Sequence, residues 1–143
     1  MQRVLIDSGP LAALFDADDR WHVRTMAFLR AYRGELLCSA ANVTEAVWIA
    51  SNASHAVATN LIAWLGRGAV RIFNIEQRDL ARIGTLFAKY RDQNPDFADL
   101  ALLALAEREH VYEAITIDER DFALYRLRNG RRLVNLLTQT QQS

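Results

Sequence analysis

Short apolar segments alternate with helix-like segments along almost the whole of this 143-residue chain. The apolar segments are bounded by Gly, Pro, Asn or Asp, as strands are, and the segments between them repeat apolar residues at helical spacing. This alternation favours parallel pairing through right-handed crossovers, so we expect a three-layer α/β domain with a central, mostly parallel sheet of four to five strands. The expected strands cover 4–6, 36–39, 69–73, 112–116 and 131–136, and the helices after position 20 cover 21–32, 42–51, 55–65, 76–91, 94–109 and 118–124.

Length and composition predict one globular unit, which we place at residues 1–137, followed by a polar tail at 138–143. No run of 18 apolar residues exists, and the N-terminus has no secretory signal pattern. The single cysteine, Cys38, cannot form an internal disulfide and is expected to be a small buried apolar residue. These features favour a cytoplasmic protein.

The charge balance excludes several classes of site. Formal net charge is zero, so any contact with nucleic acid must be local. Lys89 is the only lysine and the other sixteen basic residues are arginines, which excludes a Walker A phosphate loop and disfavours Schiff-base chemistry. The arginines fit phosphate recognition, but a GC-rich coding genome explains them equally well.

Four acidic residues occupy positions from which they can meet. Asp7 follows the first strand, Glu45 begins the helix after the second, Asp99 lies in the helix 94–109, and Asp118 follows the fourth strand. A parallel sheet gathers its strand ends at one edge, where α/β proteins bind their ligands. Carboxylates brought together repel one another unless a cation intervenes, so the pattern predicts a hard divalent metal such as Mg²⁺.

Each acid also has a purely structural explanation. Asp7 and Asp118 could cap the helices that follow them, and Glu45 could complete a capping box with Asn42. If Asn94 and Pro95 begin the helix 94–109, Asp96 only complements the helix dipole at its second position. Asp99 would then lie past the first turn among apolar neighbours, which favours a functional role for it. Asp121 is expected to be a surface residue, with a place in the site as the alternative.

Other motifs are absent or weak. The three histidines lack zinc-binding spacing, and neither a nucleophile elbow nor a dinucleotide-binding glycine loop exists. Trp21, Trp48 and Trp64 occupy helical positions and are expected in the core rather than as surfaces for base stacking. The segment 126–132 holds four arginines, of which Arg126, Arg128 and Arg131 are candidates for binding an RNA backbone; a solvated loop explains them equally well.

Taken in order, four segments resemble the motifs of the PIN domain family, and in particular the VapC-type ribonuclease toxins of toxin–antitoxin systems. These segments are 4–11, 42–46, 96–106 and 116–122. They span almost the whole chain, and their order and spacing are more specific than any one of them. Ser8 stands where the family often has threonine, and its hydroxyl preserves the chemistry.

The resemblance implies a PIN-like nuclease over 1–137 that hydrolyses RNA with Mg²⁺ or Mn²⁺. It carries Asp7, Glu45, Asp99 and Asp118 over as the acidic site, with metal ligands Asp7, Asp99, Asp118 and, secondarily, Asp96. It also implies homodimers and a small cognate antitoxin as a partner. The alternatives are a stand-alone PIN nuclease in RNA processing and a non-catalytic binding module.

Two further classes with an acidic pocket fit poorly. A haloacid-dehalogenase-type phosphohydrolase needs a second aspartate two residues after the first, and position 9 is glycine. That class and the receiver domains of phosphotransfer systems both need a lysine, and only Lys89 is present.

Overall fold

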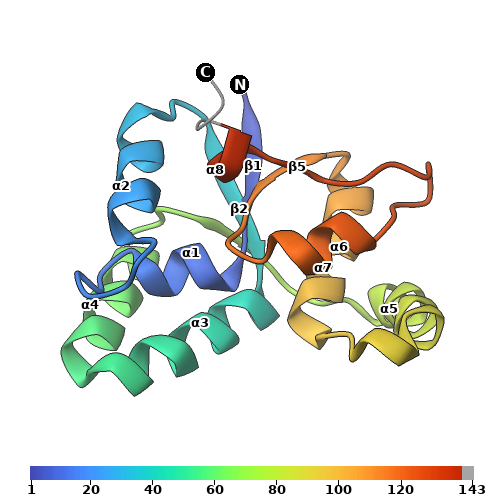
Figure 1. Cartoon of the computed structure of the whole chain (residues 1–143), viewed down its shortest axis with the longest axis horizontal. Helices are drawn as coiled ribbons and strands as arrows, with labels where there is room; N and C mark the ends of the chain where they lie inside the picture. The colour runs from blue at the N-terminus through green and yellow to red at the C-terminus, as the bar shows by residue number, and fades with distance from the viewer. Residues whose placement is uncertain (140–143) are drawn as a thin grey trace.

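The computed structural model describes residues 1–139, which form a five-stranded parallel sheet with helices on both faces (Figure 1). The sheet order is β3-β2-β1-β4-β5, and every neighbouring pair is parallel. The predicted three-layer α/β architecture is therefore confirmed. The strands are β1 (Arg3–Ile6), β2 (Glu35–Ser39), β3 (Arg71–Phe73), β4 (Glu113–Ile115) and β5 (Val134–Asn135).

Alternate residues of the central strands point into two separate cores. Leu5 and Leu37 belong to the core formed with α5 (Gln77–Lys89) and α6 (Phe97–Glu109). Their neighbours Val4, Ile6 and Cys38 belong to the opposite core. That second core is built with α3 (Ala40–Ala53) and α4 (His55–Gly66), beside α1 (Ser8–Ala13) and α2 (His22–Ala31). Strand residues buried on both faces explain why the strand segments are continuously apolar.

Helix α6 is the most buried helix, and it positions acidic residues at its first turn. All residues from Ala98 to Ala106 are buried, and all of them except Asp99 are apolar, as expected for a helix packed on every side. The prediction that Asn94 and Pro95 begin it is wrong. Asn94 adopts a left-handed conformation after the short 3-10 turn Arg91–Gln93, and Asp96 caps the helix instead. Asp99 is consequently the third residue of α6, within its first turn.

The C-terminal part of the chain is mostly irregular. Helix α7 (Glu119–Leu124) follows β4, and α8 (Leu136–Gln139) follows β5 directly. Of the predicted tail at 138–143, Thr138 and Gln139 belong to α8, and 140–143 lie outside the described residues.

Two further expectations concern exposure. Trp21 and Trp64 pack against the core, but Trp48 is 67% exposed, so its prediction as a core residue is wrong. Cys38 is fully buried, as predicted. Within residues 1–139, no helix combines the length and apolar character needed to cross a membrane.

Candidate active site

Asp7 is fixed at the carboxyl edge of the sheet by its own hydrogen bonds. Its backbone N–H donates to the carbonyl of Ile115 at 3.1 Å, which extends the pairing of β1 with β4. Its Oδ1 accepts from the Ser8 N–H at 2.8 Å, and its Oδ2 accepts from the Thr116 hydroxyl at 2.7 Å. Burial raises the pKa of Asp7 to about 6 although both bonds favour the carboxylate.

Glu45 lies in the second turn of α3 and faces the same edge. Ser39 and Asn42 close the N-terminus of α3 with a reciprocal capping box, so Glu45 does not have the capping role that its spacing from Asn42 suggested. Burial, followed by the charge of Asp96 and a side-chain hydrogen bond with it, raises the pKa of Glu45 to about 7. All of these effects disfavour the charged form of the Glu45 side chain.

Asp96 and Asp99 occupy the start of α6. Asp96 is not at the second helical position; it is the cap, and its Oδ1 accepts from the N–H groups of Ala98 at 2.8 Å and Asp99 at 3.2 Å. The Asp99 side chain is 5% exposed, and burial, with the charges of Asp7 and Asp96 next, raises the pKa of Asp99 to about 9. A carboxyl group buried this deeply among other acids is protonated at pH 7 unless a bound cation compensates its negative charge.

Asp118 and Asp121 come from the loop after β4 and from α7. Asp118 caps α7 by accepting from the Asp121 N–H at 3.2 Å, as its structural explanation predicted. One carboxylate oxygen each from Asp99, Asp118 and Asp121 lie within 4.8 Å of one another. Asp121 was expected at the surface and is instead partly buried beside the other two. Asp7 and Glu45 lie outside this closest group of three.

Asn42 and Thr116 hold the acid-bearing elements together, and sequence analysis did not identify either as part of the site. Asn42 is fully buried, and its Nδ2 donates to the Ser8 hydroxyl at 3.4 Å and to the Ala98 carbonyl at 3.3 Å. It therefore ties the start of α3 to the starts of α1 and α6. The Thr116 hydroxyl donates to Asp7 and accepts from the Asp118 N–H at 3.0 Å. Both residues begin motif segments, 42–46 and 116–122, and this position together with their polar type was the available signal.

We call the six residues Asp7, Glu45, Asp96, Asp99, Asp118 and Asp121 the acidic cluster. The pKa values of Asp7, Glu45, Asp99 and Asp121 are each raised by at least one other member, and no ion pair within residues 1–139 includes any of the six. The charge of Arg120 opposes this effect at Asp121, whose pKa is nevertheless raised by burial and by Asp118. An all-oxygen, partly buried and unneutralised donor set fits a hard divalent cation.

The predicted RNA-binding arginines lie elsewhere or are already engaged. The Arg126 guanidinium donates to the carbonyls of Ala123, Leu124 and Tyr125 and so closes the C-terminus of α7. Arg128 lies 3.8 Å from Glu107, near the other end of α6. Arg131 is exposed, and its N–H donates to Asn129 at 2.9 Å. The structure does not bring these side chains into the acidic cluster.

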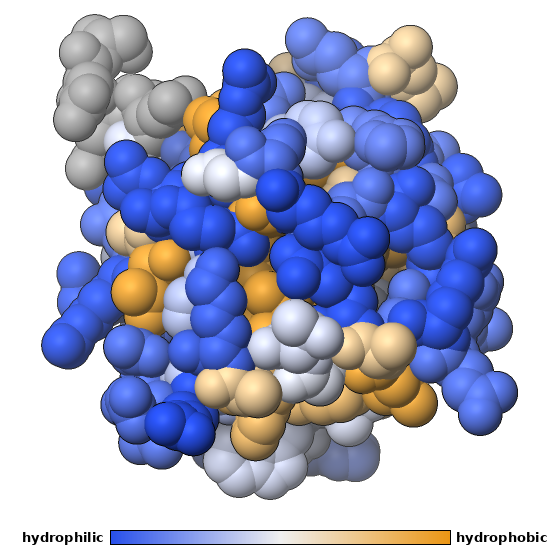
Figure 2. Space-filling view, turned by 90° about the vertical axis from the view of Figure 1, so that its right-hand side faces the viewer, coloured by the Kyte–Doolittle hydropathy of each residue, from blue (hydrophilic) through white to orange (hydrophobic). Residues whose placement is uncertain are grey.

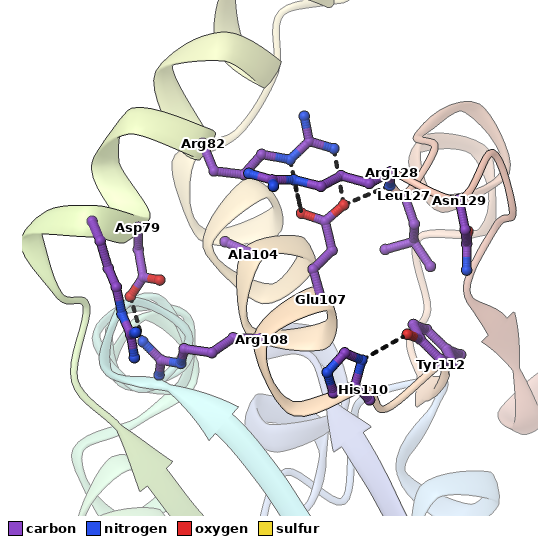
Figure 3. Close-up of a pocket in the computed structure, with 11 residues that line it drawn as sticks. Asp79, Arg82, Ala104, Glu107, Arg108, His110, Tyr112, Leu127, Arg128 and Asn129 are labelled. Carbon is purple, nitrogen blue, oxygen red and sulfur yellow. Dashed lines mark hydrogen bonds and ion pairs between the residues drawn. The ribbon is translucent and has the colours of Figure 1, made fainter.

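Arg128 belongs instead to a network of charges around a cavity of about 460 Å³ (Figure 3). Glu107 accepts from Arg82 at 2.8 and 2.9 Å and from the Arg128 N–H at 2.6 Å. Arg108 pairs with Asp79 at 2.6 Å. Figure 2 shows that this side of the molecule is covered mainly by hydrophilic residues. Every acid in this network has an arginine partner, unlike those of the acidic cluster.

Comparison with known proteins supports the resemblance drawn from the four motifs. No family model matches the chain. In sequence it is 26% identical to the ribonuclease VapC26 of Mycobacterium tuberculosis over 130 residues, which cover 90% of this chain and 96% of that protein.

Two solved structures share its fold. VapC20 of Mycobacterium tuberculosis, a toxin that cleaves the sarcin–ricin loop, matches with a TM-score of 0.78 at 16% identity, over 85% of this chain and 94% of that one. A toxin–antitoxin complex from Klebsiella pneumoniae matches with a TM-score of 0.63 at 23% identity, over 84% of this chain and 90% of that one. The chain is therefore similar to VapC-type proteins in sequence and has a PIN-like fold, as predicted.

Proposed function

We propose that this chain is a metal-dependent endoribonuclease and the toxin component of a toxin–antitoxin system. The observation that carries the proposal is the acidic cluster. Apart from Asp96, its residues are buried or partly buried at the carboxyl edge of a PIN-like sheet, and no basic side chain within residues 1–139 forms an ion pair with any of the six. Similarity to the ribonuclease VapC26 along nearly the whole chain supports RNA as the substrate. We assign this nuclease activity to a PIN-like domain at residues 1–137.

The acidic cluster supplies the ligands for Mg²⁺ or Mn²⁺. Asp99 and Asp118 are the central pair, Asp7 faces them from β1, and Asp121 joins because its oxygen lies with theirs. Asp96 is a secondary ligand, since one of its oxygens already caps α6. When bound, the cation would offset the charge of the scissile phosphate and lower the pKa of a coordinated water.

The protein side chains then complete hydrolysis of the phosphodiester bond. Glu45 is the candidate general base, because it belongs to the acidic cluster but lies outside the closest group of three carboxylates, which leaves it free to take a proton from the attacking water. Thr116 orients Asp7, and Asn42 fixes the distance between the helices that carry Glu45 and Asp99. Loss of such supporting bonds typically lowers activity by about 10- to 100-fold.

Partners follow from the same proposal. The structural match to a toxin–antitoxin complex supports a small antitoxin that inhibits the nuclease. We also propose a homodimer, in line with the family resemblance, and a cytoplasmic location, where the RNA substrate is found. Co-purification of the chain with the product of a short neighbouring gene would test the antitoxin.

A metal-dependent cleavage assay tests the nuclease itself. Purified protein is incubated with a structured RNA mixture in Mg²⁺, in Mn²⁺ and in EDTA, and Asp7→Asn serves as the control for contaminating nuclease. We expect cleavage only with metal and only by the natural chain. Equal cleavage by Asp7→Asn at saturating metal, or no cleavage of any RNA by a folded protein, would contradict the proposal and leave a non-catalytic binding module.

A further inference from the structure

An open groove of about 600 Å³ adjoins the acidic cluster and exposes two aromatic side chains. Trp48 of α3 is 67% exposed and Phe97 of α6 is 44% exposed. Both line the groove together with Ile75. Exposing the apolar rings of Trp48 and Phe97 to water in one groove is unfavourable. Such an exposed apolar surface indicates a binding site.

The groove and the acidic cluster are continuous. Glu45 and Asp96 line the groove and also belong to the cluster. Trp48 follows Glu45 by three residues on α3, which places the two on the same helix face. Phe97 directly follows the Asp96 cap, and the bond from Asn42 to the Ala98 carbonyl holds the starts of α3 and α6 side by side (Figure 1). A strand of RNA cleaved at the cluster would therefore pass the groove.

The residues that line the groove favour an RNA base over a phosphate group. It contains no arginine or lysine and two acids, so a phosphate is repelled there. A base is uncharged, offers a flat face to Trp48 and Phe97, and can donate from its amino edge to a carboxylate. Only an unpaired base exposes that face, because bases inside a duplex stack on one another.

We propose that this groove binds an unpaired base of the RNA substrate beside the cleaved phosphate, with Trp48 and Phe97 as its stacking surfaces. This inference rests on the proposed ribonuclease function and adds the subsite that selects single-stranded RNA. Trp48 and Phe97 are binding residues and make no contact with the reacting atoms.

The experiment measures binding and does not depend on cleavage. A single-stranded oligoadenylate of about ten nucleotides is titrated into protein carrying Asp99→Asn, so that bound RNA stays intact. Because Trp48 is exposed and the other two tryptophans pack against the core, stacking should quench the Trp48 fluorescence. The Kd of variants that lack Trp48 is measured by the fluorescence anisotropy of end-labelled oligoadenylate. Trp48→Ala should raise Kd by about 5- to 150-fold, and Trp48→Tyr should recover most of the affinity because it restores a flat ring.

Matched controls separate stacking from general effects. Phe97→Ala should also weaken binding, whereas Phe87→Ala removes an equally exposed ring on α5, away from the groove, and should leave Kd unchanged. A fully paired duplex of the same sequence should bind equally to Trp48→Ala and to its parent. Thermal unfolding verifies that each variant is folded. If Trp48→Ala does not fold, the affinities of Phe97→Ala and Trp48→Tyr for RNA test the stacking instead.

The outcomes separate this inference from the proposed function. Equal affinity of the folded Trp48→Ala and Phe97→Ala proteins for oligoadenylate overturns it, even if the natural chain cleaves RNA. If Trp48→Ala weakens binding of a protein partner but not of RNA, the inference is also overturned, and the groove is a binding site for that partner. Base-dependent quenching by a natural chain that cleaves no RNA would instead support the groove and contradict only the nuclease.

Discussion

The two ends of α6 carry charged clusters of opposite design. At its start, Asp99 lies among five other carboxylates, and no ion pair within residues 1–139 reaches them. About 12 Å further along the helix, Glu107 sits between Arg82 and Arg128, and Arg108 pairs with Asp79 (Figure 3). One helix thus holds an unneutralised cluster and a neutralised one.

The difference indicates which cluster serves folding and which serves a ligand. Paired charges of low exposure join α5, α6 and the loop at 126–131 and leave no group unsatisfied. Like charges in a buried site destabilise the folded state, so residues without a function there would be replaced during evolution. Their presence at the start of α6 is explained by a cation that neutralises them, so mutations at the two ends should affect different properties.

The largest expected effect is the loss of cleavage in Asp99→Asn. The substitution keeps shape but removes a central metal ligand, so the rate of RNA cleavage should fall by at least about 100-fold, more than loss of a supporting contact. Cleavage rates at saturating Mg²⁺ and circular dichroism of the folded variant measure the two properties. An Asp99→Asn protein that cleaves RNA at the natural rate would remove Asp99 from the site.

At the other end of the helix, Glu107→Gln should lower stability and spare chemistry. It leaves Arg82, whose side chain is 18% exposed, without its charged partner, so we expect a loss of about 1–3 kcal/mol in the free energy of unfolding. Urea denaturation measures this loss. Asp92→Asn is the matched control, because its ion pair with Arg91 is almost fully exposed and should contribute little. A cleavage rate per folded molecule that falls with Glu107→Gln would contradict the division between the two ends.

A smaller effect concerns pH and metal together. The pKa values of Asp7, Glu45 and Asp99 rise to about 6, 7 and 9 in the folded protein. Between their ordinary values near 4 and these raised values, the folded state binds more protons than the unfolded state, so stability falls as pH increases. The midpoint of thermal unfolding in EDTA should therefore drop between about pH 5 and about pH 9.

Saturating Mg²⁺ should flatten this dependence, since a cation replaces the protons and stabilises the folded state by mass action. Asp99→Asn should remove the part of the decline above about pH 7, because Asp99 is the cluster member whose pKa is raised to about 9. A midpoint in EDTA that stays level or increases with pH would show that the carboxylates are neutralised within the chain.

Local patterns predicted the parts of the site that depend on strand ends. Asp7 and Asp118 follow strands, and a parallel sheet places both at one edge. Asn94 was mistaken for the cap of α6 because Asn-Pro and Asp are both good helix starts; only the bonds accepted by Asp96 distinguish them. Asp121 lies one helical turn after Asp118, a spacing that surface residues share.

Contacts between distant segments could not be predicted. The bond from Asn42 to Ala98 joins residues 56 positions apart, and that from Thr116 to Asp7 joins residues 109 apart. Both depend on how the helices and strands are placed relative to one another. The partners of Arg126 and Arg128 depend on the path of an irregular segment, which carries no periodic pattern.

The smallest expected effect separates the arginines of that segment. Arg131 is exposed and has no ion pair within residues 1–139, whereas Glu107 offsets the charge of Arg128. If Arg131 contacts the RNA backbone, Arg131→Ala should reduce the slope of log affinity against log salt concentration by about one. Arg128→Ala should change that slope less. Equilibrium binding of RNA to Asp99→Asn protein at several salt concentrations measures both slopes, and an unchanged slope in Arg131→Ala would place the RNA path away from this loop.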